Sequence, residues 1–336
     1  MTTPPAMATP LLVGEVSVDV TVAPRGAENK VRLGGIAHAA RAFWALDQPF
    51  AAGVIVPKYL ENAAKSYLSA CGCAKFVVLA SVSAAPNVTL IFDPTEVDDQ
   101  GYDTLLRDEK VVEMAAGIGP SQFSDFADAL VFPGTYDLAS ICAQFPTSIN
   151  LHIDAAYDVP SYNELRAVPR RIATVFMSTS SSLFGRDDFK GMQSITTELQ
   201  LLNPEAVILK ENRGGSRLYV FADSSVTEIP AQLGTTVNSV GVGDVFDATY
   251  ITYRGRGLVE AAWRATYCEF SVCSNNRRRY LPGLCPPGLE IESQSVERFR
   301  WDSPSVGSEA GLRHLFGGAG FQRPGKRRDR TRGFRS

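Results

Sequence analysis

The amino-acid sequence predicts an α/β fold with a mostly parallel central sheet, helices on both faces and a small β-lid beside the sheet. Three observations support this fold class. Short apolar runs, typical of buried strands, recur along the chain. Helical patterns lie between several of them, which favours parallel strands joined by crossover helices. Near the N-terminus, apolar and polar residues alternate instead, which predicts a strand with one face open to solvent.

The composition fits a globular protein and excludes several classes. The chain has 336 residues, a mass of 36.4 kDa, a net charge of −3 and 45% hydrophobic residues, too apolar for a disordered chain. The near-neutral charge argues against nucleic-acid binding through a basic surface. No apolar run is long enough to cross a membrane, and the start resembles no secretory signal. We therefore expect a cytoplasmic protein with no membrane or nucleic-acid partner.

The first elements follow in order from the N-terminus. Residues 1–10 are rich in Pro, Thr and Ala, and we expect them to be disordered. Leu11–Val13 is a continuous apolar run, as in a strand buried on both faces. Residues 16–22 alternate between valine and polar residues, which predicts that this strand leaves the core. Gly34 and Gly35 precede an Ala-rich helix over Ile36–Leu46.

Strands and helices then alternate as far as about residue 276. Strands are expected at Phe50–Val56, Phe76–Leu79, Val88–Phe92, Ala129–Phe132, Ile149–Ile153, Ile172–Phe176, Ala206–Leu209 and Leu218–Phe221. Helices are expected at Leu60–Cys71, Ser121–Ala127, Asp137–Phe145 and Phe189–Leu202. An acidic turn separates Val88–Phe92 from Tyr102–Leu106, which indicates an antiparallel hairpin. This hairpin and the alternating N-terminal strand would form the lid, from about 15–34 and 86–107.

The strand–helix pattern stops after Asn276. Residues 277–336 contain arginine clusters, several prolines and a Gly/Arg-rich end, so we expect a disordered basic tail. Two alternatives stay open: an arm that binds nucleic acid or a membrane, and a C-terminus replaced through a reading-frame shift.

The segment Asn238–Phe246 has the pattern of an anion site. Gly241, Val242 and Gly243 precede a helical pattern, so their backbone amides would point out of a helix N-terminus. Glycine lets a phosphate approach the backbone closely. Asp244 would repel a bound phosphate, but it could accept a proton from a hydroxyl that attacks phosphorus. The alternative is an ordinary helix cap after a glycine turn.

Three segments, in order, resemble motifs of the PfkB (ribokinase-like) family of carbohydrate and nucleoside kinases. Asn238–Phe246 is similar to its signature Asp-Thr-x-Gly-Ala-Gly-Asp-x-Phe. Val13-Gly14-Glu15 followed by Asp19, and then Gly34-Gly35, resembles its N-terminal part. Lys210–Ser216 resembles its Thr-x-Gly-x-x-Gly turn, with Asn212 in place of the first glycine. The resemblance spans residues 11–276 and implies a three-layer ribokinase-like sandwich.

The resemblance also implies roles for individual residues. Asp244 would be the catalytic base, and the amides of Gly241, Val242 and Gly243 the anion hole. The substrate would be a sugar or a nucleoside, and the co-substrate ATP with Mg²⁺, with no residue assigned as a metal ligand. Substrate hydroxyls would be bound by Asp19, Gly34, Gly35 and His38. The nucleotide would be bound by Lys210, Asn212, Gly215 and Ser239. On residue patterns alone, Asp19 and His38 could equally be surface residues. Asp154 follows a strand, at the sheet edge where the sites of α/β proteins gather, and could equally cap the next turn.

Departures from the family pattern keep a second function open. Ser178–Ser181 stands where the family carries Asn-x-x-Glu, which organises Mg²⁺ and phosphate. The leading hypothesis is ATP-dependent phosphorylation of a hydroxyl group, and the alternative is a degenerate relative that binds a sugar or nucleotide without phosphoryl transfer. A dehydrogenase is weaker, because no Gly-x-Gly-x-x-Gly follows the first strand. Exposed strand edges in the lid also suggest a homodimer formed through the lid.

Overall fold

The computed structural model describes residues 9–23, 28–94, 101–156, 158–185, 192–211, 215–232 and 238–274. Most of the segment expected to be disordered at the N-terminus, the whole basic segment 277–336 and Asn212 lie outside the described residues. None of the helices in the described part has the length and apolar character needed to cross a bilayer.

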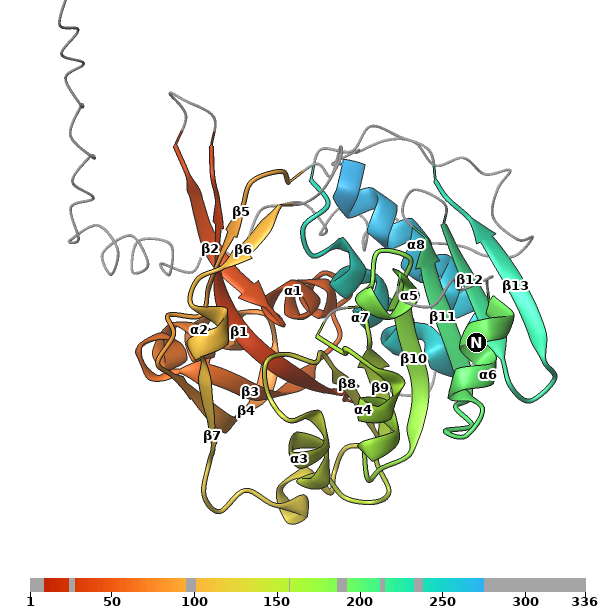
Figure 1. Ribbon diagram of the computed structural model, residues 1–336, viewed down its shortest axis with the longest axis horizontal. Helices are drawn as coiled ribbons and strands as arrows, with labels where there is room; N and C mark the ends of the chain where they lie inside the picture. Colours follow the sequence, from red (N-terminus) through yellow and green to blue (C-terminus); the bar gives the residue numbers. More distant parts are fainter. Residues whose placement is uncertain are drawn as a thin grey trace, which may run out of the picture.

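A large, mostly parallel sheet forms the centre of the molecule (Figure 1). Its strand order is β13-β12-β11-β10-β9-β8-β1-β3-β4-β7, and β7, β12 and β13 run antiparallel to their neighbours. These strands are β1 (Leu11–Thr21), β3 (Phe50–Pro57), β4 (Cys73–Ser83), β7 (Val111–Met114), β8 (Asp128–Val131), β9 (Asn150–Asp154), β10 (Ile172–Ser178), β11 (Ala206–Glu211), β12 (Gly215–Val220) and β13 (Ser225–Pro230). The apolar run Leu11–Val13 lies in the interior, paired with β3 and β8.

Helices cover both faces of this sheet, as the sequence predicts. They are α1 (Ala37–Ala45), α2 (Glu61–Ala70), α3 (Leu138–Ala143), α4 (Tyr162–Ala167), α5 (Ser182–Gly185), α6 (Met192–Leu199), α7 (Val242–Tyr253) and α8 (Leu258–Ser274). Leu12 belongs to the core shared with α1, α2, α7 and α8. Leu11 and Val13 belong to the core shared with α3, α4 and α6. Because successive side chains of a strand point to opposite faces, this division produces three layers.

Single 3-10 turns join several of these elements, namely η1 (Lys58–Leu60), η2 (Arg107–Glu109), η3 (Pro120–Phe123) and η4 (Arg254–Arg256). The helix expected at Ser121–Ala127 is only the turn η3, so this prediction was wrong. Phe123 alone of that turn is buried, and one apolar anchor does not supply the stripe that stabilises a short helix.

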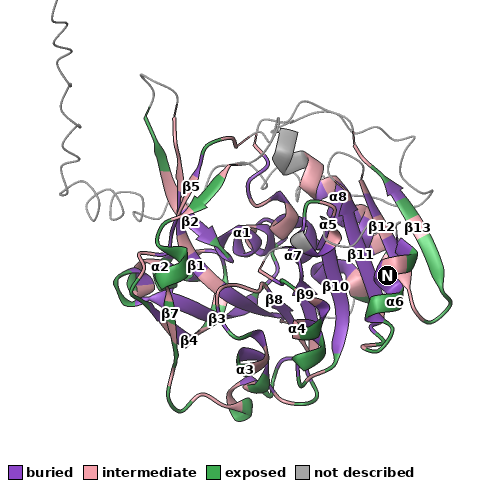
Figure 2. Ribbon diagram, in the orientation of Figure 1, coloured by how far each residue is buried: buried purple, intermediate pink, exposed green. Residues whose placement is uncertain are grey.

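A second, smaller sheet lies beside the first (Figure 1). It consists of the outer half of β1, together with β2 (Lys30–Gly35), β5 (Val88–Ile91) and β6 (Tyr102–Thr104). The pair β5–β6 is the hairpin that the sequence indicates, although β6 ends at Thr104 and Leu106, expected within the strand, adopts a left-handed conformation with φ +52°. Figure 2 shows exposed residues along this sheet and buried strands in the large one.

Candidate functional site

The N-terminus of α7 lies where the sequence places an anion site. Gly241 precedes the helix with φ +78°, a conformation that favours glycine. The Val242 amide donates a hydrogen bond to the Ser239 carbonyl (3.2 Å). Amides in the first turn of a helix have no partner within it, so the amides of Gly243 and Asp244 remain suited to an anion. The sequence predicted an anion site made by the amides of Gly241, Val242 and Gly243, whereas in the structure the Val242 amide already has a hydrogen-bond partner.

Both glycines of this turn have close neighbours. A Cβ at Gly241 would overlap the ring of His38, so α1 and the start of α7 pack together only because this residue has no side chain. A Cβ at Gly243 would lie 3.3 Å from the Lys210 ammonium. The predicted anion site is therefore bordered on one side by a histidine and on the other by a cation.

Three aspartates and one lysine gather at this end of α7. Lys210 Nζ donates to both carboxylate oxygens of Asp247 (3.1 Å each) and to Asp154 Oδ2 (3.3 Å). Asp154 ends β9, Lys210 lies near the end of β11, and Asp247 is one helical turn after Asp244. The carboxyl ends of parallel strands meet at one edge of a sheet, which explains why residues so distant in sequence come together.

The electrostatic environment of Asp244 favours a proton acceptor. Burial, followed by the negative charge of Asp154, raises the pKa of Asp244 to about 7, although Lys210 opposes this shift. A carboxyl group with a pKa near neutrality can accept a proton at physiological pH and release it again. The fully buried Asp247 also has a pKa well above its ordinary value, through burial and then Asp154.

Asp19, His38 and Gly34 form a second polar group. His38 Nε2 donates to Asp19 Oδ2 (2.9 Å), and both side chains are buried, so neither is the surface residue that the sequence left open. Burial lowers the pKa of His38, although Asp19 opposes this, so its imidazole is neutral at pH 7. A Cβ at Gly34 would overlap the Asp19 carboxylate. Through His38, this group adjoins Gly241.

Gly35 shapes the same region. It has φ +59°, and a Cβ there would overlap the carbonyl oxygen of Glu15. The amide of Ile36 donates to that same carbonyl (3.0 Å), so the turn into α1 is tied to β1. Gly34 and Gly35 therefore let β2 and α1 approach β1 at the level of Asp19.

The residues expected to bind the nucleotide have different structural environments. Lys210 is held by Asp154 and Asp247, as described above. Gly215 begins β12, and a Cβ there would overlap the backbone of β13, so this glycine has a structural reason of its own. Ser239 donates through its amide (2.8 Å) and its hydroxyl (3.1 Å) to the Pro94 carbonyl, which connects the turn before α7 to the segment after β5.

The hydroxyl groups of Ser178, Ser180 and Ser181 are hydrogen-bonded within this segment or to the helix that follows it. The hydroxyls of Ser178 and Ser180 are 2.8 Å apart, and the Ser181 hydroxyl accepts from the Phe184 amide (3.1 Å). No cluster of three or more His, Cys, Asp or Glu side chains suited to a metal ion occurs among the described residues. Asp154 and Asp247 both face Lys210 instead. The described residues therefore do not fit a magnesium site built by the protein.

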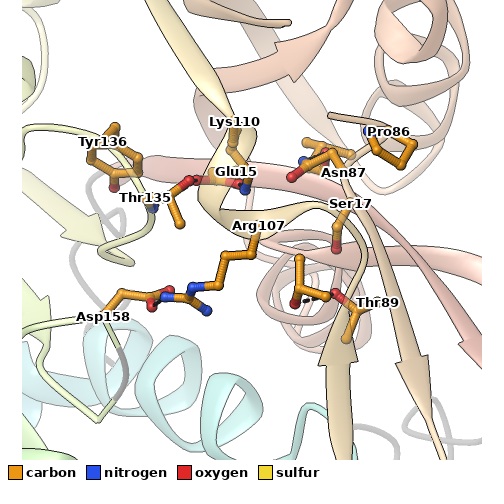
Figure 3. A network of polar contacts seen from close by, with 12 residues as sticks. Glu15, Ser17, Pro86, Asn87, Thr89, Arg107, Lys110, Thr135, Tyr136 and Asp158 are labelled. Atoms are coloured by element: carbon orange, nitrogen blue, oxygen red, sulfur yellow. Dashed lines mark hydrogen bonds and ion pairs between the residues drawn. The ribbon is translucent and has the colours of Figure 1, made fainter. Parts of the chain in front are cut away.

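A further polar network lies around Glu15 and was not predicted (Figure 3). Glu15 accepts hydrogen bonds from Lys110 (2.7 Å) and from the amide and hydroxyl of Thr135 (2.9 and 3.0 Å). Arg107, just after the β5–β6 hairpin, forms an ion pair with Asp158, which follows β9. These contacts tie the second sheet to the large one. Of the residues in this network, only Glu15 had a sequence signal, as part of a motif. In the cluster around Lys210, Asp247 could have been predicted as a site residue from its spacing to Asp244.

Comparison with known proteins identifies the fold of this chain. No protein-family model and no curated protein matches the sequence. Among solved structures, the protein is similar to one described as ribokinase II from Escherichia coli, in complex with ATP and Mg²⁺ (TM-score 0.60, 12% identity, covering 87% of this chain and 99% of that one). It is also similar to the nucleoside kinase of Methanocaldococcus jannaschii, an archaeal member of the ribokinase family (0.57, 15%, 87% and 98%).

A fructokinase from Vibrio cholerae O395, in its fructose-, ADP- and calcium-bound form, gives a similar result (TM-score 0.59, 13% identity, covering 80% of this chain and 93% of that one). Identities this low establish the fold and leave the activity to be argued from the site. The chain has the fold of the ribokinase (PfkB) family.

Proposed function

We propose that the protein is a kinase that transfers the γ-phosphoryl group of ATP to a hydroxyl group of a sugar or nucleoside. The observation that carries this proposal is Asp244, a carboxyl group with a pKa of about 7 in the first turn of a helix whose amides suit an anion. The structural neighbours named above include complexes with ATP and with fructose and ADP, which is consistent with this reaction.

Each part of the site has a place in the reaction. Asp19 and His38 would bind hydroxyl groups of the substrate and orient one of them toward α7. As its oxygen forms a bond to the γ-phosphorus, the bond from that phosphorus to the β,γ-bridging oxygen breaks and ADP leaves. Asp244 accepts the hydroxyl proton, and the amides of Gly243 and Asp244 stabilise negative charge on the transferred group. In kinases Mg²⁺ is bound by substrate phosphates and water together with one or two carboxylates, so we expect it to arrive with ATP.

The test is an ADP-release assay against a panel of sugars, polyols and nucleosides. With an active substrate, Asp244→Asn should lower kcat by roughly 10²–10⁴-fold, the usual contribution of a positioned general base. The matched control is Asp125→Asn, which removes an exposed carboxylate and should leave kcat unchanged. An Asp244→Asn variant that keeps kcat within tenfold of the wild type would refute the assignment of the base.

A second candidate is a protein that binds a sugar or nucleotide without phosphoryl transfer. The observation that favours it is the serine-rich turn at Ser178–Ser181, which presents no carboxylate to a metal-bound phosphate. Calorimetry separates the two functions. Binding of a ligand by folded protein, with no ADP formed over hours, supports this candidate, whereas turnover excludes it.

A further inference from the structure

Lys210 connects the large sheet to the first turns of α7. It pairs with Ser178 of β10 on one side, where its carbonyl also accepts a hydrogen bond from the Thr179 amide (3.0 Å), and with Ser216 of β12 on the other, so its backbone is fixed from both sides. Its side chain is buried and lies over the ring of Phe176, 5.8 Å from the ring centre. A lysine in such surroundings is rare unless its charge is paired, so its partners indicate its role.

Several carboxyl groups surround the single ammonium group of Lys210. Asp154 and Asp247 accept its hydrogen bonds, and the charge of Asp244 also acts on it. Burial alone would lower the pKa of Lys210, but the carboxylates outweigh burial and raise the pKa above its ordinary value. The lysine therefore stays charged, and its single charge is shared among several carboxyl groups.

The other elements that pack on α7 bring no competing cation to this end. Neutral His38 on α1 and the carboxylate of Asp19 on β1 face the start of the helix. On α8, Arg264 pairs with Glu260 and stacks on Tyr253, the last residue of α7. Arg254 of η4 contacts Asp128 of β8, beyond the opposite end. Among the described residues, Lys210 is thus the cation that acts on Asp244.

We propose that Lys210 is a positioning residue, which holds Asp154 and Asp247 beneath the first turns of α7 and places a positive charge beside the turn that carries Asp244. The proposal deepens the proposed function, on which it rests for the use of Asp244 as a base. The geometry that carries it is the position of the ammonium beside this turn: a Cβ built at Gly243, the residue before Asp244, would lie 3.3 Å from Lys210 Nζ. Without this charge, the pKa of Asp244 should rise above about 7, so that a smaller fraction of the carboxyl group is ionised and able to accept a proton at pH 7.

The experiment measures the titration of Asp244 itself, in the protein without substrate. Carbon-13 NMR of labelled aspartate carboxyl groups follows the titration, and the signal lost in Asp244→Asn identifies the residue. Lys210→Met should raise the midpoint of Asp244 by roughly one unit or more, the size expected from losing an opposite charge nearby. Lys210→Arg keeps the charge and should restore a midpoint close to that of the wild type. Lys65→Met removes an exposed lysine on α2 and should change nothing.

A second variant should shift the midpoint in the opposite direction. Asp154→Asn removes a negative charge that raises the pKa of Asp244, so the midpoint should fall below that of the wild type. If Lys210→Met does not fold, Asp154→Asn tests how the charges around Asp244 set its pKa. This variant should fold, because Lys210 stays paired with Asp247. A midpoint unchanged in Lys210→Met, or unchanged or raised in Asp154→Asn, overturns the proposal.

Activity separates this proposal from the proposed function. If the wild type is a kinase, the pH at which kcat/KM is half-maximal should follow the NMR midpoint in each variant, and an unshifted profile in Lys210→Met overturns the positioning role. If no substrate gives ADP while both midpoints shift as expected, the role of Lys210 in setting the charge of Asp244 stands and the kinase function fails.

Discussion

The pKa of Asp244 gives the clearest prediction for a single residue. Its carboxyl group must be ionised to accept a proton, and burial raises its pKa to about 7. We therefore expect kcat/KM to fall as the pH decreases through about 7, approaching a tenfold loss per unit below it. A rate profile between pH 5.5 and 9 tests this. A flat profile down to pH 5.5 would contradict the use of Asp244 as the base.

Gly34 provides a prediction for the substrate side of the site. A methyl group at Gly34 would overlap the Asp19 carboxylate, so Gly34→Ala should displace Asp19 from His38. A hydrogen bond to a charged group is worth about 1.5–3 kcal/mol, so kcat/KM should fall by roughly 10- to 100-fold. Gly119→Ala is the control, since a Cβ there meets nothing within 4 Å. Full activity in Gly34→Ala would remove Asp19 from the substrate site.

How far the site could be predicted depends on the kind of residue. Gly241 and Gly243 were found because a glycine turn before a helix is a local pattern. Asp247 and Lys210 were not joined to Asp244, because their contact depends on how β11 meets α7. Glu15 and Lys110 are 95 positions apart, and no spacing rule brings such a pair together.

Among the strands of the large sheet, those with an apolar pattern were predicted, whereas the two at its edges, β7 and β13, were not. Val111–Met114 forms β7 although both of its end residues are exposed, so it lacks the alternation of a half-buried strand. Ser225–Pro230, which forms β13, is largely exposed and is held by its pairing with β12. Buried strands such as β3 and β10 carry their signal in their own residues, whereas edge strands depend on a neighbour.

A polar cluster joins β8, β9 and the end of α7, and it predicts how stability depends on pH. Asp128 accepts hydrogen bonds from His152 (3.1 Å) and Arg254 (3.0 Å). Burial raises the pKa of Asp128, but these partners outweigh burial and lower it overall. Asp128→Asn should therefore lower the free energy of unfolding by roughly 1–3 kcal/mol at pH 7, measured in urea. No change would show that the cluster contributes nothing.

The pKa values in this cluster predict how its own contribution to the free energy of unfolding changes with pH. Burial lowers the pKa of His152, so the unfolded chain takes up a proton near pH 6.5 while the folded protein does not. The contribution of this cluster to the free energy of unfolding should decrease as the pH falls below 6.5, whereas Asp244 and Asp247, whose pKa values are raised, act in the opposite direction. The contribution of the cluster should decrease further near and below 3.8, where the lowered pKa of Asp128 applies. His152→Gln should flatten the first decrease, and an unchanged slope would place its origin elsewhere.

At the scale of the molecule, dimerisation through the second sheet stays a prediction. Phe92, Tyr102 and Leu106 are exposed on or beside this sheet, with 53%, 41% and 55% of their surface accessible. Light scattering should give twice the chain mass of 36.4 kDa, and Phe92→Glu should halve it. A wild-type protein that remains monomeric at high concentration would exclude this interface.

The strand β1 belongs to both sheets, and this continuity limits how the molecule can deform. Glu15 pairs with Ile55 of the large sheet, and the next residue, Val16, pairs with Gly35 of the small one, so no slack segment separates them. The small sheet should therefore bend relative to the large one about Glu15, and the displacement of its residues should increase with their distance from Glu15. Asp19, four residues after Glu15, is also held by its hydrogen bond to His38, so it should move less relative to α7 than Thr21 at the end of the strand.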